Sequence, residues 1–238
     1  MMKLLPNIKE RLRRTYFSMG NFYAIFLTFT VLIPVFTNFI TSNNSVSTSV
    51  DPSIPSFFYG IAIGIVLVTS GFNSSIQFGT SRKTIFVAYI ITTVIISISM
   101  IVINLFLSIG IRQISWIKNI EVTSAAFHLS QYSLGVLVFD FVLIMIGFSF
   151  GILIGLIIKR VKKEYLLIIG TILMFTPALV SYIVERLSHD VQQQLLTFIS
   201  VITGAENRNI WALITMILVI TIMLHLGSWL IIRRQPVK

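Results

Sequence analysis

The run LGVLVFDFVLIMIGFSFGILIGLII, residues 134–158, has a single charged residue in 25 positions. A segment of about 20 apolar residues is long enough to cross the hydrocarbon core of a bilayer as a helix. Its apolar residues are continuous rather than alternating with polar ones, which disfavours a strand of a membrane barrel. Because backbone groups in lipid must be hydrogen-bonded within the segment, this run predicts a transmembrane helix.

Five further apolar runs are similar, and the composition of the chain agrees with them. Of the 238 residues, 55% are hydrophobic and 11% are charged, whereas a soluble domain carries about 25% charged residues. We therefore expect an all-α membrane protein that forms a single domain over residues 1–238. The six spans are expected at about 22–40, 56–72, 85–109, 134–158, 165–184 and 210–232.

The basic residues predict the orientation of these spans. Fourteen of the 18 lie before the first span, between the second and third, between the fourth and fifth, or after the sixth. By the positive-inside rule, both termini and residues 73–83 face the cytoplasm. The net charge of +10 is thereby explained, and no nucleic-acid partner is expected. The chain has no cysteine, which excludes disulfides and thiolate metal sites.

Residues 1–20 are predicted to form an amphipathic helix that lies at the membrane interface. Its apolar face comprises Leu5, Ile8, Leu12, Tyr16 and Met19. The remaining surface, expected to face anionic headgroups, carries Lys9, Glu10, Arg11, Arg13 and Arg14. The alternative is a basic flank of the first span without fixed structure.

Residues 73–83, NSSIQFGTSRK, form a short polar and basic segment between two apolar runs. A short helical turn is expected here, ended by Gly79, with Thr80 or Ser81 capping the third span. Exposed apolar residues beside a basic pair favour a docking surface. The alternative is a tight loop whose basic pair only sets topology. The candidate docking residues are Ser75, Ile76, Gln77, Phe78, Gly79, Ser81, Arg82 and Lys83.

An amphipathic segment is also expected between the fifth and sixth spans. One helical face of residues 185–209 carries Val191, Leu195, Phe198 and Ile202. The apolar stretch is too short to cross a bilayer, so we expect a helix that lies on the outer leaflet or dips into it. The alternative is a lid packed on the other external loops.

Asp140 lies inside the fourth expected span, about 10 Å from its outer end. A charged group inside the membrane costs about 2.5–3.5 kcal/mol on insertion scales, and it usually marks function. Asp140 would then line the transport path or gate it. The alternative is a structural role, in which it reaches the interface or pairs with Arg112 or Lys118.

Gly147, Gly151 and Gly155 recur every fourth residue on the same helix. This ladder of small residues allows another helix to approach closely, either within the subunit or between subunits. His225, in the last span, is expected to be a hydrogen-bonded packing residue rather than a ligand or proton carrier. The sequence lacks a GKS or GKT phosphate loop, HExxH, G-x-S-x-G and any cluster of metal ligands, so an enzyme is not expected.

Together these features resemble the membrane subunits of type-2 ABC exporters, especially the short separate permeases of Gram-positive bacteria. The resemblance covers nearly the whole chain: a basic amphipathic N-terminal helix, six spans, both ends inside, and an external amphipathic segment before the last span. Its most specific part is the loop FGTSRKTIF, residues 78–86, in which Ser81-Arg82-Lys83 is followed by Phe86.

The resemblance implies a transporter in a bacterial cell membrane, in which this chain is the permease and a separate chain is the ATPase. Residues 73–83 would be a coupling helix that docks on a separate ATPase, and 187–203 would close the exit. Two permeases, identical or related, would pair with two ATPase copies, which bind ATP and Mg; no cofactor is expected in this chain. Small permeases of this kind often move amphipathic or antimicrobial peptides, or give immunity to them.

Two other classes of function stay open. A membrane immunity or sensor protein would bind a peptide or an ATPase without net transport. A secondary transporter predicts inverted repeats and ligands for a coupling ion at the bilayer midplane, and the sequence shows neither.

Overall fold

The computed structural model describes residues 4–41, 48–50, 52–77, 79–113, 120–122, 134–161, 182, 186, 188, 191–194, 197–198 and 210–234. The long helices in this part of the chain are α1 (Leu4–Thr41), α2 (Ser53–Gln77), α3 (Arg82–Gln113), α4 (Leu134–Arg160) and α7 (Ile210–Arg233). Two three-residue strands, β1 (Thr48–Val50) and β2 (Ile120–Val122), pair in parallel with Thr48 opposite Ile120.

Four of these helices are long and apolar enough to cross a membrane: α2, the part of α3 from Arg82 to Gly110, α4 and α7. They contain the second, third, fourth and sixth expected spans. The second span is longer than expected, because α2 continues to Gln77. The first expected span, 22–40, lies within α1, and the fifth, 165–184, lies outside the described residues except for Tyr182. The described part of the chain is therefore that of a helical, membrane-embedded protein.

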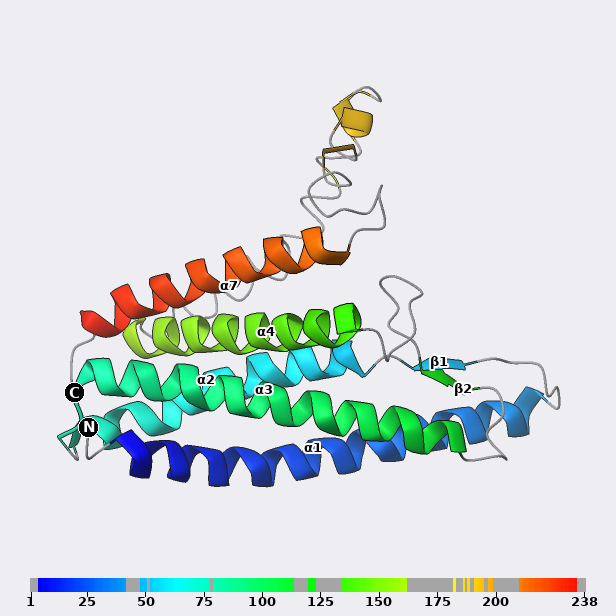
Figure 1. The fold of residues 1–238 in the computed structure, drawn as a ribbon, viewed down its shortest axis with the longest axis horizontal. Helices are drawn as coiled ribbons and strands as arrows, with labels where there is room; N and C mark the ends of the chain where they lie inside the picture. The colour runs from blue at the N-terminus through cyan, green and yellow to red at the C-terminus, as the bar shows by residue number, and fades with distance from the viewer. Residues whose placement is uncertain are drawn as a thin grey trace.

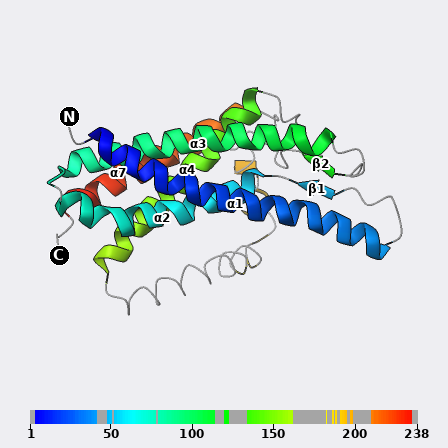
Figure 2. The same ribbon diagram turned by 90° about the horizontal axis from the view of Figure 1, so that it is seen from below.

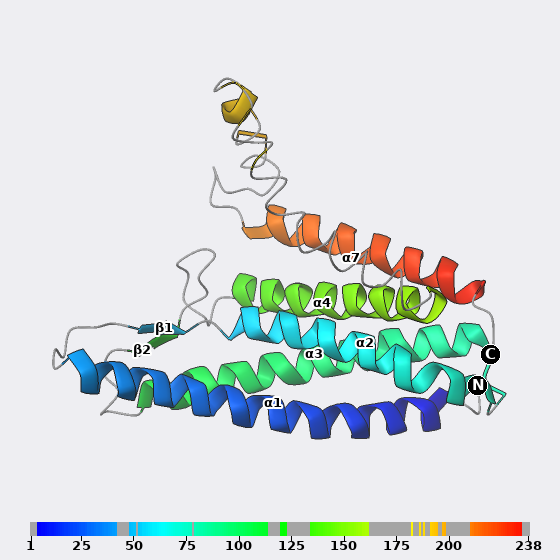
Figure 3. The same cartoon turned by 180° about the vertical axis from the view of Figure 1, so that it is seen from behind.

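The helices form an elongated bundle (Figures 1 and 3). The helix α1 lies along one side, α7 along the opposite side, and α2, α3 and α4 lie between them. Seen from below, α1 runs obliquely across α2 and α3 (Figure 2). Large apolar side chains such as Phe106, Met223 and Leu230 are more than half exposed, which is the surface expected of a helix bundle in contact with lipid.

The closest helix pair is α2 and α4, because glycines lie on both sides of their contact. A Cβ atom on Gly64 would lie 2.6 Å from the carbonyl oxygen of Phe148, and one on Gly147 would lie 2.6 Å from that of Phe57. A Cβ on Gly151 would overlap the carbonyl oxygen of Ile61. The predicted glycine ladder therefore packs against α2 within this chain. We call this contact the glycine seam.

Two clusters of buried apolar side chains hold the rest of the bundle together. The larger joins α1, α2, α3, α4 and the end of α7, and it includes Phe72, Tyr89 and Phe148, all fully buried. The smaller joins the beginnings of α4 and α7 through residues such as Phe139 and Ile214. The bundle is thus continuous from α1 to α7.

Candidate functional site

One end of the bundle gathers most of the described positive charge. The first turns of α1, the α2–α3 turn, the end of α4 and the end of α7 lie there (Figure 1). We call it the basic end. Among the described residues, its basic side chains are Lys9, Arg11, Arg13, Arg14, Arg82, Lys83, Lys159, Arg160, Arg233 and Arg234.

The turn between α2 and α3 is short and is closed by hydrogen bonds at both helix ends. Gly79 has a φ of 70°, a conformation that glycine adopts without steric cost. Its N–H donates to the carbonyl of Ile76, and the N–H of Thr80 donates to that of Ser75, which is the Schellman pattern of a helix end. The hydroxyl of Ser81 then accepts the N–H of Thr84 at 3.2 Å and caps α3.

This arrangement corrects one sequence prediction. Gly79 ends a helix and Ser81 caps the next, as expected, but residues 73–77 are the last turns of α2 rather than a separate coupling helix. The side chain of Ser75 bonds to the carbonyl of Gly71 at 2.7 Å, so its polar group is satisfied inside the helix. Ser75 is buried, Gln77 and Lys83 are exposed, and Phe78 lies outside the described residues.

Arg11 links α1 to the end of α2. Its Nε donates to Oδ1 of Asn7 at 2.7 Å, and its Nη2 donates to Oγ of Ser75 at 3.0 Å. A longer contact of 3.4 Å joins Nη1 to the carbonyl oxygen of Leu67. The guanidinium carbon also lies 4.2 Å from the centre of the Tyr89 ring, within the range of a cation–π interaction. Arg11 is only 5% exposed, and these contacts fix it between the helices.

The position of Arg11 corrects the predicted interfacial helix. Residues 4–41 form one continuous helix, so no separate surface helix ends near residue 20. The buried face carries Arg11, Thr15, Met19 and Tyr23, whereas Leu5 and Tyr16 are exposed. Of the other predicted residues, Ile8 and Leu12 are half-buried, and Arg13 and Arg14 are exposed. The polar acceptors of α2 explain the difference, because they make a buried arginine tolerable on the face that contacts α2.

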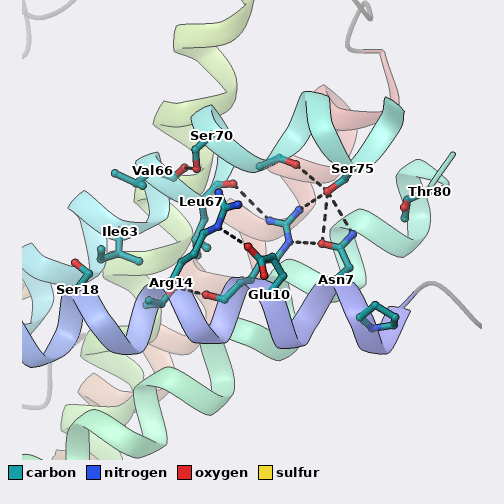
Figure 4. A pocket seen from close by; sticks show the side chains of 14 residues that line it. Asn7, Glu10, Arg14, Ser18, Ile63, Val66, Leu67, Ser70, Ser75 and Thr80 are labelled. Atoms are coloured by element: carbon teal, nitrogen blue, oxygen red, sulfur yellow. Dashed lines mark hydrogen bonds and ion pairs between the residues drawn. The ribbon is translucent and has the colours of Figure 1, made fainter. Parts of the chain in front are cut away.

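A cleft of about 720 Å³ lies between α1 and α2 beside Arg11. Its residues from α1 include Asn7, Glu10 and Arg14, and those from α2 include Ile63, Val66 and Ser70 (Figure 4). Several of these side chains are exposed, so the cleft opens on the surface of the bundle. We call it the α1–α2 cleft.

The other helices are also connected at the basic end. Nη1 of Arg82, the first residue of α3, donates to the carbonyl oxygen of Arg233, the last residue of α7, at 2.5 Å. Nζ of Lys159 donates to Oδ1 of Asn73 at 3.1 Å and so joins the ends of α4 and α2. A cation at a helix C-terminus is favourable, because the last carbonyls carry partial negative charge.

Asp140 belongs to a buried polar cluster near the opposite end of the bundle. It is 5% exposed and lies about 9 Å along α4 from Leu134. Oδ1 of Asp140 accepts a hydrogen bond of 2.7 Å from the hydroxyl of Ser53, the first residue of α2. A carboxylate at a helix N-terminus is favourable. This contact differs from both structural roles predicted for Asp140, because the residue is buried and its partner is Ser53; Lys118 and the side chain of Arg112 lie outside the described residues.

The same cluster contains Tyr23 of α1, Ser56 of α2 and Asn104 of α3. The hydroxyl of Tyr23 donates to Oδ1 of Asn104 at 2.7 Å, and Nδ2 of Asn104 donates to Oγ of Ser56 at 3.2 Å. A cavity of about 10 Å³ between Asn104, Ser108 and Asp140 is near the size that a single water needs. The cluster therefore ties α1, α2 and α3 together near Asp140 of α4.

His225 is hydrogen-bonded inside the bundle, as expected from the sequence. Its Nδ1 lies 2.9 Å from Oγ of Ser149 and 2.9 Å from the carbonyl oxygen of Thr221. Its Nε2 is buried and has no hydrogen-bond partner in the described structure. The residue also lines a groove of about 400 Å³, whose other side chains are mainly apolar, such as Phe86 and Leu218. Among the described residues, no group of three His, Asp or Glu side chains could hold a metal ion.

The predicted external closure is described only in part. Val191 and Phe198 are 39% and 63% exposed. Leu195 and Ile202 lie outside the described residues.

Comparison with known proteins found no match to the chain among family profiles, curated proteins or solved structures.

Sequence reasoning missed the Arg11 contacts and the cleft. The hydrophobic periodicity of residues 1–20 assigned Arg11 to a polar face, because this pattern contains no information about contacts with other helices. Ser75, the main partner, is 64 residues away, and no spacing rule connects them. The available signal was the concentration of Ser, Thr and Asn near the end of α2, because their side chains offer acceptors to a polar group from another helix.

Proposed function

We propose that the chain is the transmembrane subunit of an ATP-driven ABC exporter in a bacterial cell membrane. It spans the membrane six times with both termini in the cytoplasm and forms the substrate path with a second permease, identical or related. Two copies of a separate ATPase bind ATP and Mg and drive the cycle. By analogy alone, the substrate is an amphipathic or antimicrobial peptide.

The observation that carries this proposal is the basic end. It brings the α2–α3 turn together with the start of α1 and the ends of α4 and α7, and the positive-inside rule assigns such an end to the cytoplasm. An ATPase that docks there would contact several helices at once. The exposed side chains of Gln77, Ser81 and Lys83 are the docking surface we assign to the turn.

The bonds around this turn support a mechanical role. Ser75 is held by Arg11 of α1, and Arg82 is held by the last carbonyl of α7. A displacement of the turn would therefore act directly on the start of α1 and on the end of α7. Because the turn lacks a separate helix, the predicted contact area with the ATPase is smaller than the resemblance implies.

The test is a pull-down from native membranes in a mild detergent, followed by mass spectrometry and an ATPase assay. The informative variant is Lys83→Glu, which reverses an exposed charge at the turn. Arg186→Glu is the matched control, because it makes the same charge change at an exposed position outside the basic end. We expect a stoichiometric ATPase to accompany the wild type and the Arg186 variant, and to be lost from the Lys83 variant.

Three other outcomes would change the assignment. A chain that purifies without an ATPase and still moves substrate would refute the proposal. Equal loss of the ATPase in both variants would remove the α2–α3 turn as its docking site. If an ATPase associates with the chain but peptide changes neither its ATP turnover nor transport by the complex, the immunity or sensor alternative is indicated.

A further inference from the structure

The charge of Arg11 is not balanced by a carboxylate in the described structure. The ion pair at the basic end joins Glu10 to Arg14 at 2.7 Å, on the exposed side of α1. Among the described residues, the hydrogen-bond acceptors of Arg11 are all neutral, namely Asn7, Ser75 and a carbonyl of α2. These groups and the negative end of the α2 dipole make its burial possible, but they leave a full positive charge at the wall of the cleft.

Arg11 also keeps unused donors. A guanidinium has five N–H groups, and the described structure assigns three of them to acceptors. A phosphate binds arginine well, because its oxygens match the planar fork of the guanidinium. An anion in the α1–α2 cleft would therefore meet both a buried charge and free hydrogen-bond donors.

The lining of the cleft changes along its length. Asn7, Ser75 and Thr80 lie toward the α2–α3 turn. Ile63 and Val66 make the α2 wall apolar further along, where Ser18 of α1 lies opposite them (Figure 4). The distance from Ser75 to Ile63 is 12 residues of helix, or about 18 Å. A ligand that fits this gradient has an anionic head and a long apolar tail. The volume of the α1–α2 cleft, about 720 Å³, is typical of a pocket for a small ligand.

We propose that the α1–α2 cleft binds one anionic phospholipid from the leaflet at the basic end. Its phosphate contacts the guanidinium of Arg11, with Asn7 and Ser75 beside it. One acyl chain lies against Ile63, Val66 and Leu67. This site requires only that the helices are membrane-embedded, and it is independent of ATP-driven transport.

The test measures the thermal unfolding midpoint of the delipidated full chain in detergent, at constant ionic strength. Dioleoyl-phosphatidylglycerol is compared with dioleoyl-phosphatidylcholine, and native mass spectrometry counts retained lipids. We expect phosphatidylglycerol to raise the midpoint more than phosphatidylcholine does and one molecule to be retained per chain. Inorganic phosphate and glycerol 3-phosphate form separate arms, which identify a soluble anion as the occupant if they stabilise the protein equally.

Variants separate the site from general surface charge. Arg11→Gln is expected to weaken phosphatidylglycerol binding by about tenfold or more, since bonds to a charged group are lost. Arg13→Gln, the matched control, removes an exposed charge outside the cleft and should leave binding unchanged. Val66→Trp fills the apolar part of the cleft without touching Arg11, so it provides the test if Arg11→Gln does not fold.

Several results would overturn the lipid site. These are equal midpoints with the two lipids, equal stabilisation by the soluble phosphates, equal loss in the Arg11 and Arg13 variants, or full binding to the Val66→Trp protein.

Discussion

Replacing Gly151 by alanine tests the glycine seam directly. The new Cβ would overlap the carbonyl oxygen of Ile61 and lie 3.0 Å from the Cα of Gly64. Both neighbours are backbone atoms, so no side-chain rotation can relieve the contact. Carbon atoms pack at about 3.5–4.0 Å, so α2 and α4 would have to separate by about 0.5–1 Å.

The expected cost follows from two opposing effects. Overpacking of a tight contact costs about 1–3 kcal/mol. Alanine in place of glycine inside a helix raises the free energy of unfolding by about 0.5–1 kcal/mol. We expect a net loss of about 1–2 kcal/mol, which raises the ratio of unfolded to folded protein by a factor of roughly 5–30.

The assay is unfolding of the purified protein in mixed detergent micelles with increasing dodecyl sulfate, followed by circular dichroism. Gly20→Ala is the matched control, because a Cβ at this α1 position meets no atom within 4 Å. The control should be as stable as the wild type or slightly more stable. If Gly151→Ala unfolds together with the control, the close approach of α2 and α4 is refuted.

Three further substitutions test the other contacts. Gly79→Ala should lower the thermal midpoint, because a left-handed residue with a side chain costs about 1–2 kcal/mol; an unchanged midpoint would exclude the observed turn. Tyr23→Phe removes the donor to Asn104 and should cost about 1–3 kcal/mol in the same unfolding assay, whereas a cost near zero would contradict the buried bond. Asp140→Asn keeps an acceptor for Ser53 but Asp140→Ala does not, so size-exclusion chromatography should recover more folded protein from the first; equal recovery with altered transport would instead favour a path-lining role.

The positions of the long helices were the part of the fold that the sequence predicted best. The boundaries of α4 and α7 differ from the expected spans by one or two residues, because an uninterrupted apolar run leaves few alternatives in a bilayer. The glycine ladder predicted a close helix contact, but nothing in the spacing identified α2 as the partner.

The polar ends of the helices were harder to predict. Asn73 and Ser75 favour helix starts in isolation, yet α2 passes through both. Ser75 satisfies its hydroxyl within the helix and also accepts a bond from Arg11. Tertiary contacts therefore outweigh the local preference of these residues for helix starts. The same contacts bury Arg11, which the sequence pattern assigned to the membrane surface.

The glycine seam limits how this bundle can change shape. Side chains can exchange rotamers as helices slide, but backbone atoms in contact have no such freedom, so α2 and α4 would move as one body. By contrast, α1 joins the bundle through side chains: apolar ones in the larger cluster, and Arg11 and Tyr23, whose polar bonds water or a headgroup can replace. The hinge of any conformational cycle would then lie between α1 and its neighbours. A covalent cross-link joining α2 to α4 should leave that cycle intact, whereas one joining α1 to α2 should stop it.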